Sequence, residues 1–274
     1  RKLKQGGKNP RFNQIQPAKA QATLASIQPI IRQYEALLAK RQMSAAASKQ
    51  RLSITPDERP FLQVIIPLYN QRKYIKRCLE SIAQQQHCRF AVTIVDDASQ
   101  DDSFAIARQF TQGDARFQIY KSIINGGPLH NLVRCINNSK AEDKDVIVCV
   151  DGDDQLVGND SLSIVADTYT ATSCWMTYGS FITSHGARRG GAYDRRTIRD
   201  NLFRVAPWYA SHLKTFRFSL WSKLSDADLR DDDGNYFQAA LDLAFMLPML
   251  ELAGQRQSYI PDVLYIWKIG RAHV

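Results

Sequence analysis

Between residues 61 and 154, short apolar runs alternate with amphipathic stretches, and this alternation restricts the fold more than any other feature of the chain. The runs "FLQVIIPL", "AVTIVDD", "RFQIYKS" and "DVIVCVDGDD" hold many β-branched residues, which is typical of strands buried on both faces. The stretches 72–85, 102–110 and 125–139 place apolar side chains at helical spacing. This order predicts an α/β fold, with a Rossmann-like, mostly parallel sheet flanked by helices.

Each predicted strand leads into a polar turn: "YN", "DDAS", "NGG" and "DGDD", in chain order. Right-handed crossovers place all four turns at one edge of the sheet, where ligands of such sheets bind. The last turn holds Asp151, Asp153 and Asp154, and carboxylates this close repel one another unless a cation lies among them. Aspartates suit Mg²⁺ or Mn²⁺, which typically bridge a protein carboxylate and a diphosphate. The turns therefore favour a site for a nucleoside diphosphate with a divalent metal.

Two other kinds of nucleotide site are excluded by their missing glycines. A nicotinamide dinucleotide would need G-x-G-x-x-G in the first strand–helix turn, but that turn reads "PLYNQRKY". The P-loop pattern G-x-x-x-x-G-K-[ST] occurs nowhere in the chain.

The net charge of +9 lies entirely in residues 1–60, which carry twelve Lys and Arg against three acidic residues. We therefore expect a basic extension and linker over 1–60, with helical spacing from Pro29 to Leu38, ahead of a globular domain over 61–268. Residues 1–55 are expected to contact a partner protein or an anionic membrane surface. The missing initiator Met indicates a fragment, and "IGRAHV" over 269–274 reads as translated sequencing adapter.

The expected compartment is the cytoplasm, with peripheral attachment at the inner face of the membrane through the extension. No apolar run approaches the roughly 20 residues that a membrane-spanning helix needs. The five cysteines form no C-x-x-C pair and sit mostly in apolar patterns, as reduced, buried thiols do.

The motifs "VIIPLYN", "VTIVDDASQDDS", "NGG" and "CVDGDD", in this order and spacing, resemble the family 2 inverting glycosyltransferases of the GT-A fold. The resemblance covers residues 61–268 and divides them into a nucleotide-sugar half, 61–157, and an acceptor half, 158–268. It implies metal-dependent transfer, with inversion, of a hexose-type sugar from a nucleoside-diphosphate sugar to an acceptor hydroxyl. The acceptor would be a glycan, a lipid-linked molecule or a protein in surface-glycan or cell-envelope synthesis, and not a nucleic acid.

The same resemblance assigns site residues. The donor would be bound by Pro67, Tyr69, Asn70, Asp96, Asp97, Asn125, Gly126, Gly127, Asp151, His212 and Lys214. The ion, Mn²⁺ or Mg²⁺, would be held by Asp151, Asp153 and Asp154, and which of these contacts it stays open. His212 and Lys214 lie in "SHLKTFR" and are candidates for acceptor or diphosphate contact.

Asp242 is the candidate general base. It interrupts the apolar, helix-like stretch 235–254, where a charge is normally either paired or functional. The family often has an E-D pair at this point and this chain has "LD", so a structural salt bridge remains the alternative role. The Q-x-x-R-W motif of processive members is missing, which favours transfer of a single sugar.

Other interpretations stay open at this level. The aromatic and basic stretch 207–224 reads either as a platform for stacked bases or as a strand pair, and the acidic stretch 226–234 reads as a solvated loop. The two alternative functions are an inactive sugar-nucleotide-binding or anchoring module of the same fold, and a nucleotidyltransferase. The latter normally has a glycine-rich basic first loop, which "PLYNQRKY" is not.

Overall fold

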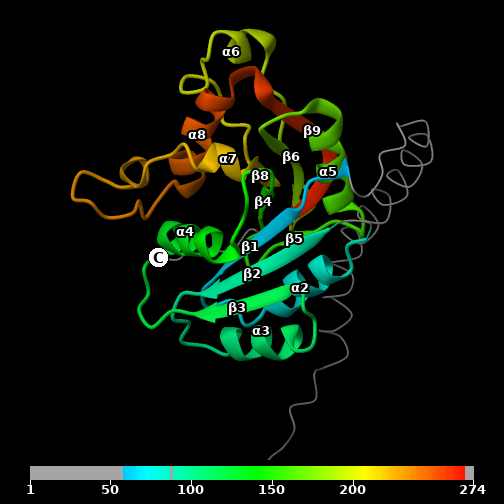
Figure 1. Ribbon diagram of the computed structural model, residues 1–274, viewed down its shortest axis with the longest axis vertical. Helices are drawn as coiled ribbons and strands as arrows, with labels where there is room; N and C mark the ends of the chain where they lie inside the picture. The colour runs from blue at the N-terminus through cyan, green and yellow to red at the C-terminus, as the bar shows by residue number, and fades with distance from the viewer. Residues whose placement is uncertain (1–57, 87–88, 269–274) are drawn as a thin grey trace, which may run out of the picture.

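The computed structural model describes residues 58–86 and 89–268, and Figure 1 shows their arrangement. In chain order the elements are β1 (Leu62–Leu68), α2 (Ile75–Ala83), β2 (Phe90–Asp96), α3 (Ser103–Thr111), β3 (Phe117–Lys121), α4 (Pro128–Ser139), β4 (Val146–Cys149), β5 (Gln155–Leu156), α5 (Ser161–Thr172), β6 (Met176–Thr183), β7 (Arg188–Arg189), α6 (Arg195–Arg199), β8 (Lys214–Arg217), α7 (Phe218–Trp221), η3 (Asp226–Leu229), α8 (Leu241–Ala253), η4 (Gly254–Arg256) and β9 (Gln257–Trp267). The helix predicted near residues 29–38, Cys88 and the stretch 269–274 lie outside the described residues.

Within the described residues, nine strands form one sheet in the order β3-β2-β1-β4-β8-β6-β9-β5, with β7 paired to β6. The four strands β3, β2, β1 and β4 are parallel, as the strand–helix alternation predicts. Beyond β4 the sheet becomes mixed, because β8 runs antiparallel to β4 and to β6, whereas β6 and β9 are parallel. The α/β fold with flanking helices is confirmed.

Two hydrophobic cores cover the two faces of the sheet. Val64, Ile66 and Leu68 of β1 pack toward α2, α3 and α5, whereas Ile65 joins the core on the side of α4 and α8. All four β1 side chains are fully buried, which is why the strand reads as a continuous apolar run. With both faces covered by helices, ligands have access mainly at the ends of the strands.

The strand pair expected in 207–224 is wrong beyond Arg217. Only Lys214–Arg217 is a strand, and the chain then turns at once into the short helix α7. Leu220 and Trp221 are neighbours in sequence and both are buried, which a helical turn allows but a strand with alternating faces does not. Of the four residues in the strand, Lys214 lines a cavity and forms a salt bridge with Asp242.

The acidic stretch 226–234 is more ordered than a solvated loop. It begins with the 3-10 helix η3, which Ser225 and Asp228 close with a capping box. Arg230 then pairs with Asp226 at 2.5 Å, and its guanidinium lies 3.9 Å from the ring centroid of Tyr236.

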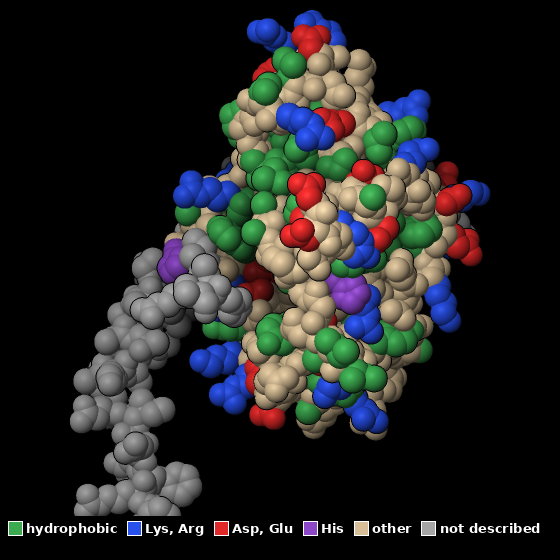
Figure 2. Space-filling view, turned by 90° about the vertical axis from the view of Figure 1, so that its left-hand side faces the viewer, with side chains coloured by type: hydrophobic (Ala, Val, Ile, Leu, Met, Phe, Trp, Pro, Cys, Tyr) green, Lys and Arg blue, Asp and Glu red, His purple; other side chains and the backbone are tan. Residues whose placement is uncertain are grey.

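The four cysteines within the described residues, Cys78, Cys135, Cys149 and Cys174, are buried and free, as expected of reduced thiols. In the described part of the chain no helix has both the length and the apolar character needed to cross a membrane. Figure 2 shows acidic side chains projecting near the middle of one face, with hydrophobic side chains beside them and Lys and Arg side chains at the top and margins.

Candidate active site

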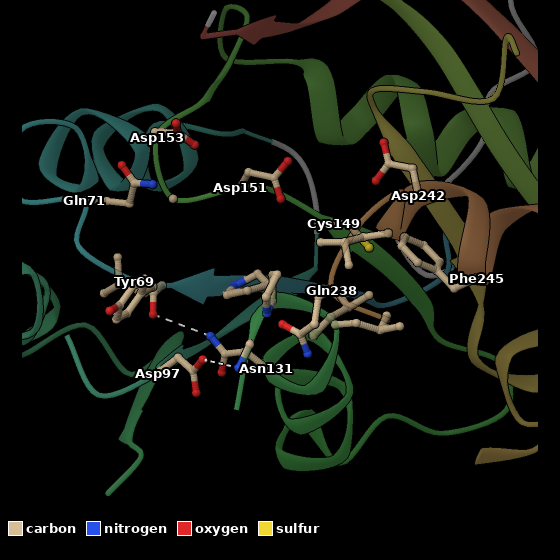
Figure 3. A pocket seen from close by; sticks show the side chains of 18 of the residues that line it. Tyr69, Gln71, Asp97, Asn131, Cys149, Asp151, Asp153, Gln238, Asp242 and Phe245 are labelled. Carbon is tan, nitrogen blue, oxygen red and sulfur yellow. Dashed lines mark hydrogen bonds between the residues drawn. The ribbon is translucent and has the colours of Figure 1, made fainter. Parts of the chain in front are cut away.

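The polar turns after β1, β2, β3 and β4 meet in one cavity of about 500 Å³. At one end of it lie Tyr69 and Asp97, as Figure 3 shows. Asp242 and Phe245 lie at the opposite end, and Asp151 stands between the two ends. Of the residues that the sequence singled out, the cavity wall includes Pro67, Tyr69, Asp97, Asn125, Gly127, Asp151, Asp153, Lys214 and Asp242.

Asp97 organises the turn between β3 and α4. Its carboxylate accepts hydrogen bonds from the backbone N–H groups of Gly126 (3.0 Å) and Gly127 (2.9 Å), and the Asn125 side chain donates to the Asp97 carbonyl (3.0 Å). Gly127 has φ +84°, which side-chain-bearing residues rarely adopt, and Pro128 follows as the first residue of α4. The "VDD" and "NGG" motifs are therefore one hydrogen-bonded unit at the cavity wall.

Three of the proposed donor residues in these turns do not line the cavity. Asn70 faces the loop after β2, where its backbone N–H donates to Ser99 Oγ (2.9 Å) and its side-chain oxygen accepts from the Gln100 N–H (2.8 Å). Asp96 is fully buried and accepts from the Ser99 N–H at 3.1 Å. Gly126 lies against His130, whose ring occupies the space that a Cβ would need.

The three carboxylates of the acidic turn have different surroundings. The Asp151 side chain is 43% exposed, and both Asp151 and Asp153 line the cavity. Asp154 is only 2% exposed and accepts from the Lys268 N–H at 2.6 Å and from the Tyr265 hydroxyl. Burial and the neighbouring Asp151 charge raise the pKa of Asp154 to about 8, so this carboxyl carries little charge at neutral pH unless a cation is near.

His212 lies close to two of these carboxylates, and the three side chains together form a possible set of metal ligands. One ligand atom each from Asp151, Asp154 and His212 lies within 4.8 Å of the other two. The His212 ring stacks on Tyr265 with centroids 4.7 Å apart, and its Nδ1 is buried with no hydrogen-bond partner. Burial, with Lys214 nearby, lowers the pKa of His212 to about 4, so the imidazole is neutral, the form that binds metals. Two carboxylates and a neutral imidazole fit a divalent cation.

Lys214 lies between the acidic turn and α8. Its ammonium is 2.7 Å from Asp242 and 3.7 Å from Asp151, and the residue is only 3% exposed. Burial acts to lower the pKa of Lys214, but the two carboxylates outweigh it and raise the pKa. Asp242 is thus a salt-bridge partner and a cavity residue at once, so the two roles considered from the sequence are not exclusive.

Several cavity residues escaped the sequence analysis, as did the buried Tyr265, which does not line the cavity. Asn131 of α4 holds the edge of the sheet by donating to the Val95 carbonyl at 2.8 Å. Tyr265, from the last strand, positions the acidic turn by accepting from the Asp151 N–H at 3.0 Å. Gln238 and Phe245 enter from the segment around α8 (Figure 3). The apolar spacing of α4 and α8 marked these stretches as helices but carried no signal for which residues reach the cavity.

Comparisons with known proteins identify the family and the relatives of this chain. The sequence profile described as "Glycosyl transferase family 2" matches residues 63–223. The chain is 26% identical over 226 residues to the glycosyltransferase GlyA of Streptococcus pneumoniae, a match that covers 77% of this chain and 31% of the relative. The chain spans about a third of the length of the first curated relatives that it matches.

Two solved structures share the fold. TarS 1–349 of S. aureus, in complex with UDP-GlcNAc, is 22% identical with a TM-score of 0.58, and the match covers 77% of this chain and 59% of TarS 1–349. A mannosyltransferase of Pyrobaculum calidifontis, in complex with GDP-Man and Mn²⁺, is 18% identical with a TM-score of 0.57, and the match covers 90% of this chain and 69% of that one. These likenesses confirm the predicted GT-A fold.

Proposed function

We propose that this chain, which belongs to glycosyl transferase family 2, moves a sugar from a nucleoside-diphosphate sugar to an acceptor hydroxyl with inversion at the anomeric carbon. The proposal rests on one observation: Asp151, Lys214 and Asp242 lie next to one another in the cavity that Asp97 also lines. A donor bound with its nucleoside at Asp97 and its diphosphate at Asp151 would present its anomeric carbon toward Asp242.

The nucleoside would occupy the end of the cavity formed by Pro67, Tyr69, Asp97 and Asn125. Tyr69 is 42% exposed, so its ring is available to a base or ribose. The complexes of TarS 1–349 with UDP-GlcNAc and of the mannosyltransferase with GDP-Man support a nucleotide sugar as the ligand.

A divalent cation, Mn²⁺ or Mg²⁺, would be held by Asp151 and Asp154 with His212, while Asp153 lines the cavity beside them. When bound, such an ion neutralises the charge that builds on the leaving diphosphate. The mannosyltransferase complex with Mn²⁺ supports this assignment. Asp154 also accepts from the Lys268 N–H and Tyr265, so it fixes the end of β9 as well as the ion.

Asp242 would act as the general base. Its carboxylate removes the proton from the acceptor hydroxyl while that oxygen forms a bond to the anomeric carbon and the bond to the diphosphate oxygen breaks. Attack from the face opposite the leaving group inverts the configuration. Lys214 keeps the Asp242 carboxylate charged and limits its motion through the 2.7 Å contact. The acceptor itself, a glycan, a lipid-linked molecule or a protein of the cell surface, and peripheral contact through residues 1–55 remain parts of the proposal.

The test is turnover of UDP-, GDP- and dTDP-sugars by the full chain with Mn²⁺ or Mg²⁺. We expect release of the nucleoside diphosphate from one donor class and loss of this release in excess EDTA. Asp242→Asn keeps the shape of the side chain but removes the proton acceptor, so transfer should fall by about 10²–10⁴ while nucleotide affinity stays within about twofold. Asp232→Asn, an exposed change in the loop before α8, is the matched control and should behave as the parent.

Three outcomes would contradict separate parts of the proposal. Full activity in EDTA would refute the role of the metal. Parental transfer by Asp242→Asn would refute the base. A chain that binds nucleoside diphosphates but turns over none of the donors would favour the inactive binding module instead.

A further inference from the structure

The end of the cavity next to Asp242 has an apolar floor, to which Cys149 of β4 and Leu241 and Phe245 of α8 contribute, and Leu129 and Leu132 of α4 add to the apolar lining of the same cavity. All five side chains belong to, or pack against, the hydrophobic core on this face of the sheet. Four of them are at most 7% exposed, and Leu241 is half-buried. The floor is therefore the outer surface of a packed core, with a fixed shape.

Two polar groups at this end each have one hydrogen-bond partner. The Lys214 ammonium donates to Asp242, and the Gln238 amide nitrogen donates to the Tyr236 carbonyl at 2.9 Å. The floor side chains carry no hydroxyl, amide or charged group, so a ligand hydroxyl directed at them would lose water without gaining a strong hydrogen bond, which is unfavourable. A methyl group directed there would lose only apolar contact with water, which is favourable.

The position of the floor identifies what would lie on it. Figure 3 shows Cys149 and Phe245 beside Asp242, and Tyr69 and Asp97 at the far end of the cavity. In the proposed function, the nucleoside lies at Asp97 and the anomeric carbon lies between Asp151 and Asp242. The group above the floor is then the donor sugar itself, not the base or the ribose.

We infer that the donor is a hexose bearing a methyl group, and that this methyl group packs on the apolar floor near Leu241. Two kinds of sugar carry such a group: an acetamido sugar and a 6-deoxy sugar. The inference rests on the proposed function, because the proposed donor orientation places the sugar there.

Leu241 is the residue through which the inference is best tested. It is the least buried member of the floor and the first residue of α8, so a polar replacement there disturbs the core least. Leu241→Asn keeps a similar volume but offers a polar amide to the sugar. Leu243→Asn is the matched control, since Leu243 is two residues further along the same helix, is 41% exposed and does not line this cavity.

The experiment measures dissociation constants by titration calorimetry on the full chain with Mn²⁺ present. UDP, GDP and dTDP are titrated first to establish which base the site accepts. Donor pairs follow: UDP-glucose with UDP-N-acetylglucosamine, UDP-galactose with UDP-N-acetylgalactosamine, and GDP-mannose and dTDP-glucose each with its 6-deoxy derivative. The first two pairs test the acetamido group, and the last two test the 6-deoxy group.

For one pair with the accepted base, the methyl-bearing donor should bind tighter by about 10–200-fold, the range for small apolar groups in apolar pockets. Leu241→Asn should reduce this ratio to below about threefold without changing the affinity for the nucleoside diphosphate, and Leu243→Asn should leave the ratio unchanged. Equal binding within every pair, or an unchanged ratio in Leu241→Asn, would overturn the inference alone. Failure of all nucleoside diphosphates to bind would overturn the proposed function together with it.

Discussion

At the scale of single residues, the charge on Asp242 depends on Lys214. Burial by itself would raise the pKa of Asp242, but the charge of Lys214, together with the Lys214 hydrogen bond, holds the pKa below its usual value. Asp242 is therefore ionised throughout the neutral range. The same contact makes the carboxylate a weaker proton acceptor. As the proposed general base, Asp242 would therefore be fully deprotonated at neutral pH but only weakly basic.

Lys214→Met should move the acid limb of the activity profile to higher pH. Met preserves the length of the stem but removes the charge, so the effect of burial remains and the pKa of Asp242 rises above its ordinary value of about 4. The base is then protonated, and activity lost, at a higher pH than in the parent. The measurement is kcat/KM against pH at saturating Mn²⁺, since Lys214 also lies near Asp151.

An exposed lysine provides the control for this change. Lys223→Met should leave the acid limb where it is, because Lys223 is exposed and does not line the cavity. An acid limb that does not move in Lys214→Met would show that another group controls it.

At the scale of elements, the turn from β3 into α4 depends on a backbone conformation with positive φ at Gly127 and on hydrogen bonds from neighbouring elements. Asp97 at the end of β2 holds this turn through two backbone N–H groups, and Asn131 of α4 holds the neighbouring sheet edge. Hydrogen bonds therefore connect three elements that are separate in sequence. A change in the turn should affect stability and nucleotide binding together.

Gly127→Ala tests this coupling, with Gly113→Ala as a matched control. Both glycines have strongly positive φ, +84° and +89°, so each substitution should destabilise the fold by about 1–3 kcal/mol. A Cβ at Gly127 would also lie 2.5 Å from Gln238 Oε1, whereas one at Gly113 would meet nothing within 4 Å. Urea unfolding should show a loss in both variants, and calorimetry should show weaker nucleotide binding only in Gly127→Ala. Equal binding by the two variants would mean that the turn does not shape the site.

At the scale of the whole molecule, the excess positive charge and the described cavity residues lie in different parts of the chain. Residues 1–60 carry a net charge of +9 and the remaining residues carry none. Among the described residues, those that line the cavity begin at Pro67. We therefore predict that this basicity serves attachment and solubility rather than the binding of the donor.

Deleting residues 1–55 should leave the dissociation constant for the accepted nucleoside diphosphate within about twofold, while solubility or attachment to anionic vesicles changes. The truncation keeps Arg59, whose guanidinium lies 2.8 Å from Asp167 of α5, so the described start of the domain remains anchored. Calorimetry on the shortened chain provides the measurement, and circular dichroism checks its folding. A folded truncation that no longer binds nucleotide would show that the extension takes part in the site.

The sequence by itself determined the parallel half of the sheet, from β1 to β4, and the edge at which its turns meet. Two-sided burial is visible as continuous apolar runs, and crossover handedness brings the turns after these strands to one edge. The meeting of Tyr69, Asp97, Asn125 and Asp151 in one cavity follows from these rules. These rules do not determine the direction of each side chain. Asn70, for example, forms hydrogen bonds with the loop after β2 and does not line the cavity.

Only the tertiary structure decided the other half. Antiparallel pairing of β4 and β8 sets Lys214 opposite Cys149, and the packing of α8 brings Asp242 to within 2.7 Å of the Lys214 ammonium. Likewise, His212 meets Asp151 because β8 and the acidic turn lie side by side in the mixed part of the sheet. Contacts between residues so far apart in sequence depend on strand order and register, which no local sequence pattern records. The physical reason is that pairing between distant strands, and not the spacing of residues along the chain, positions Lys214, Asp151 and Asp242.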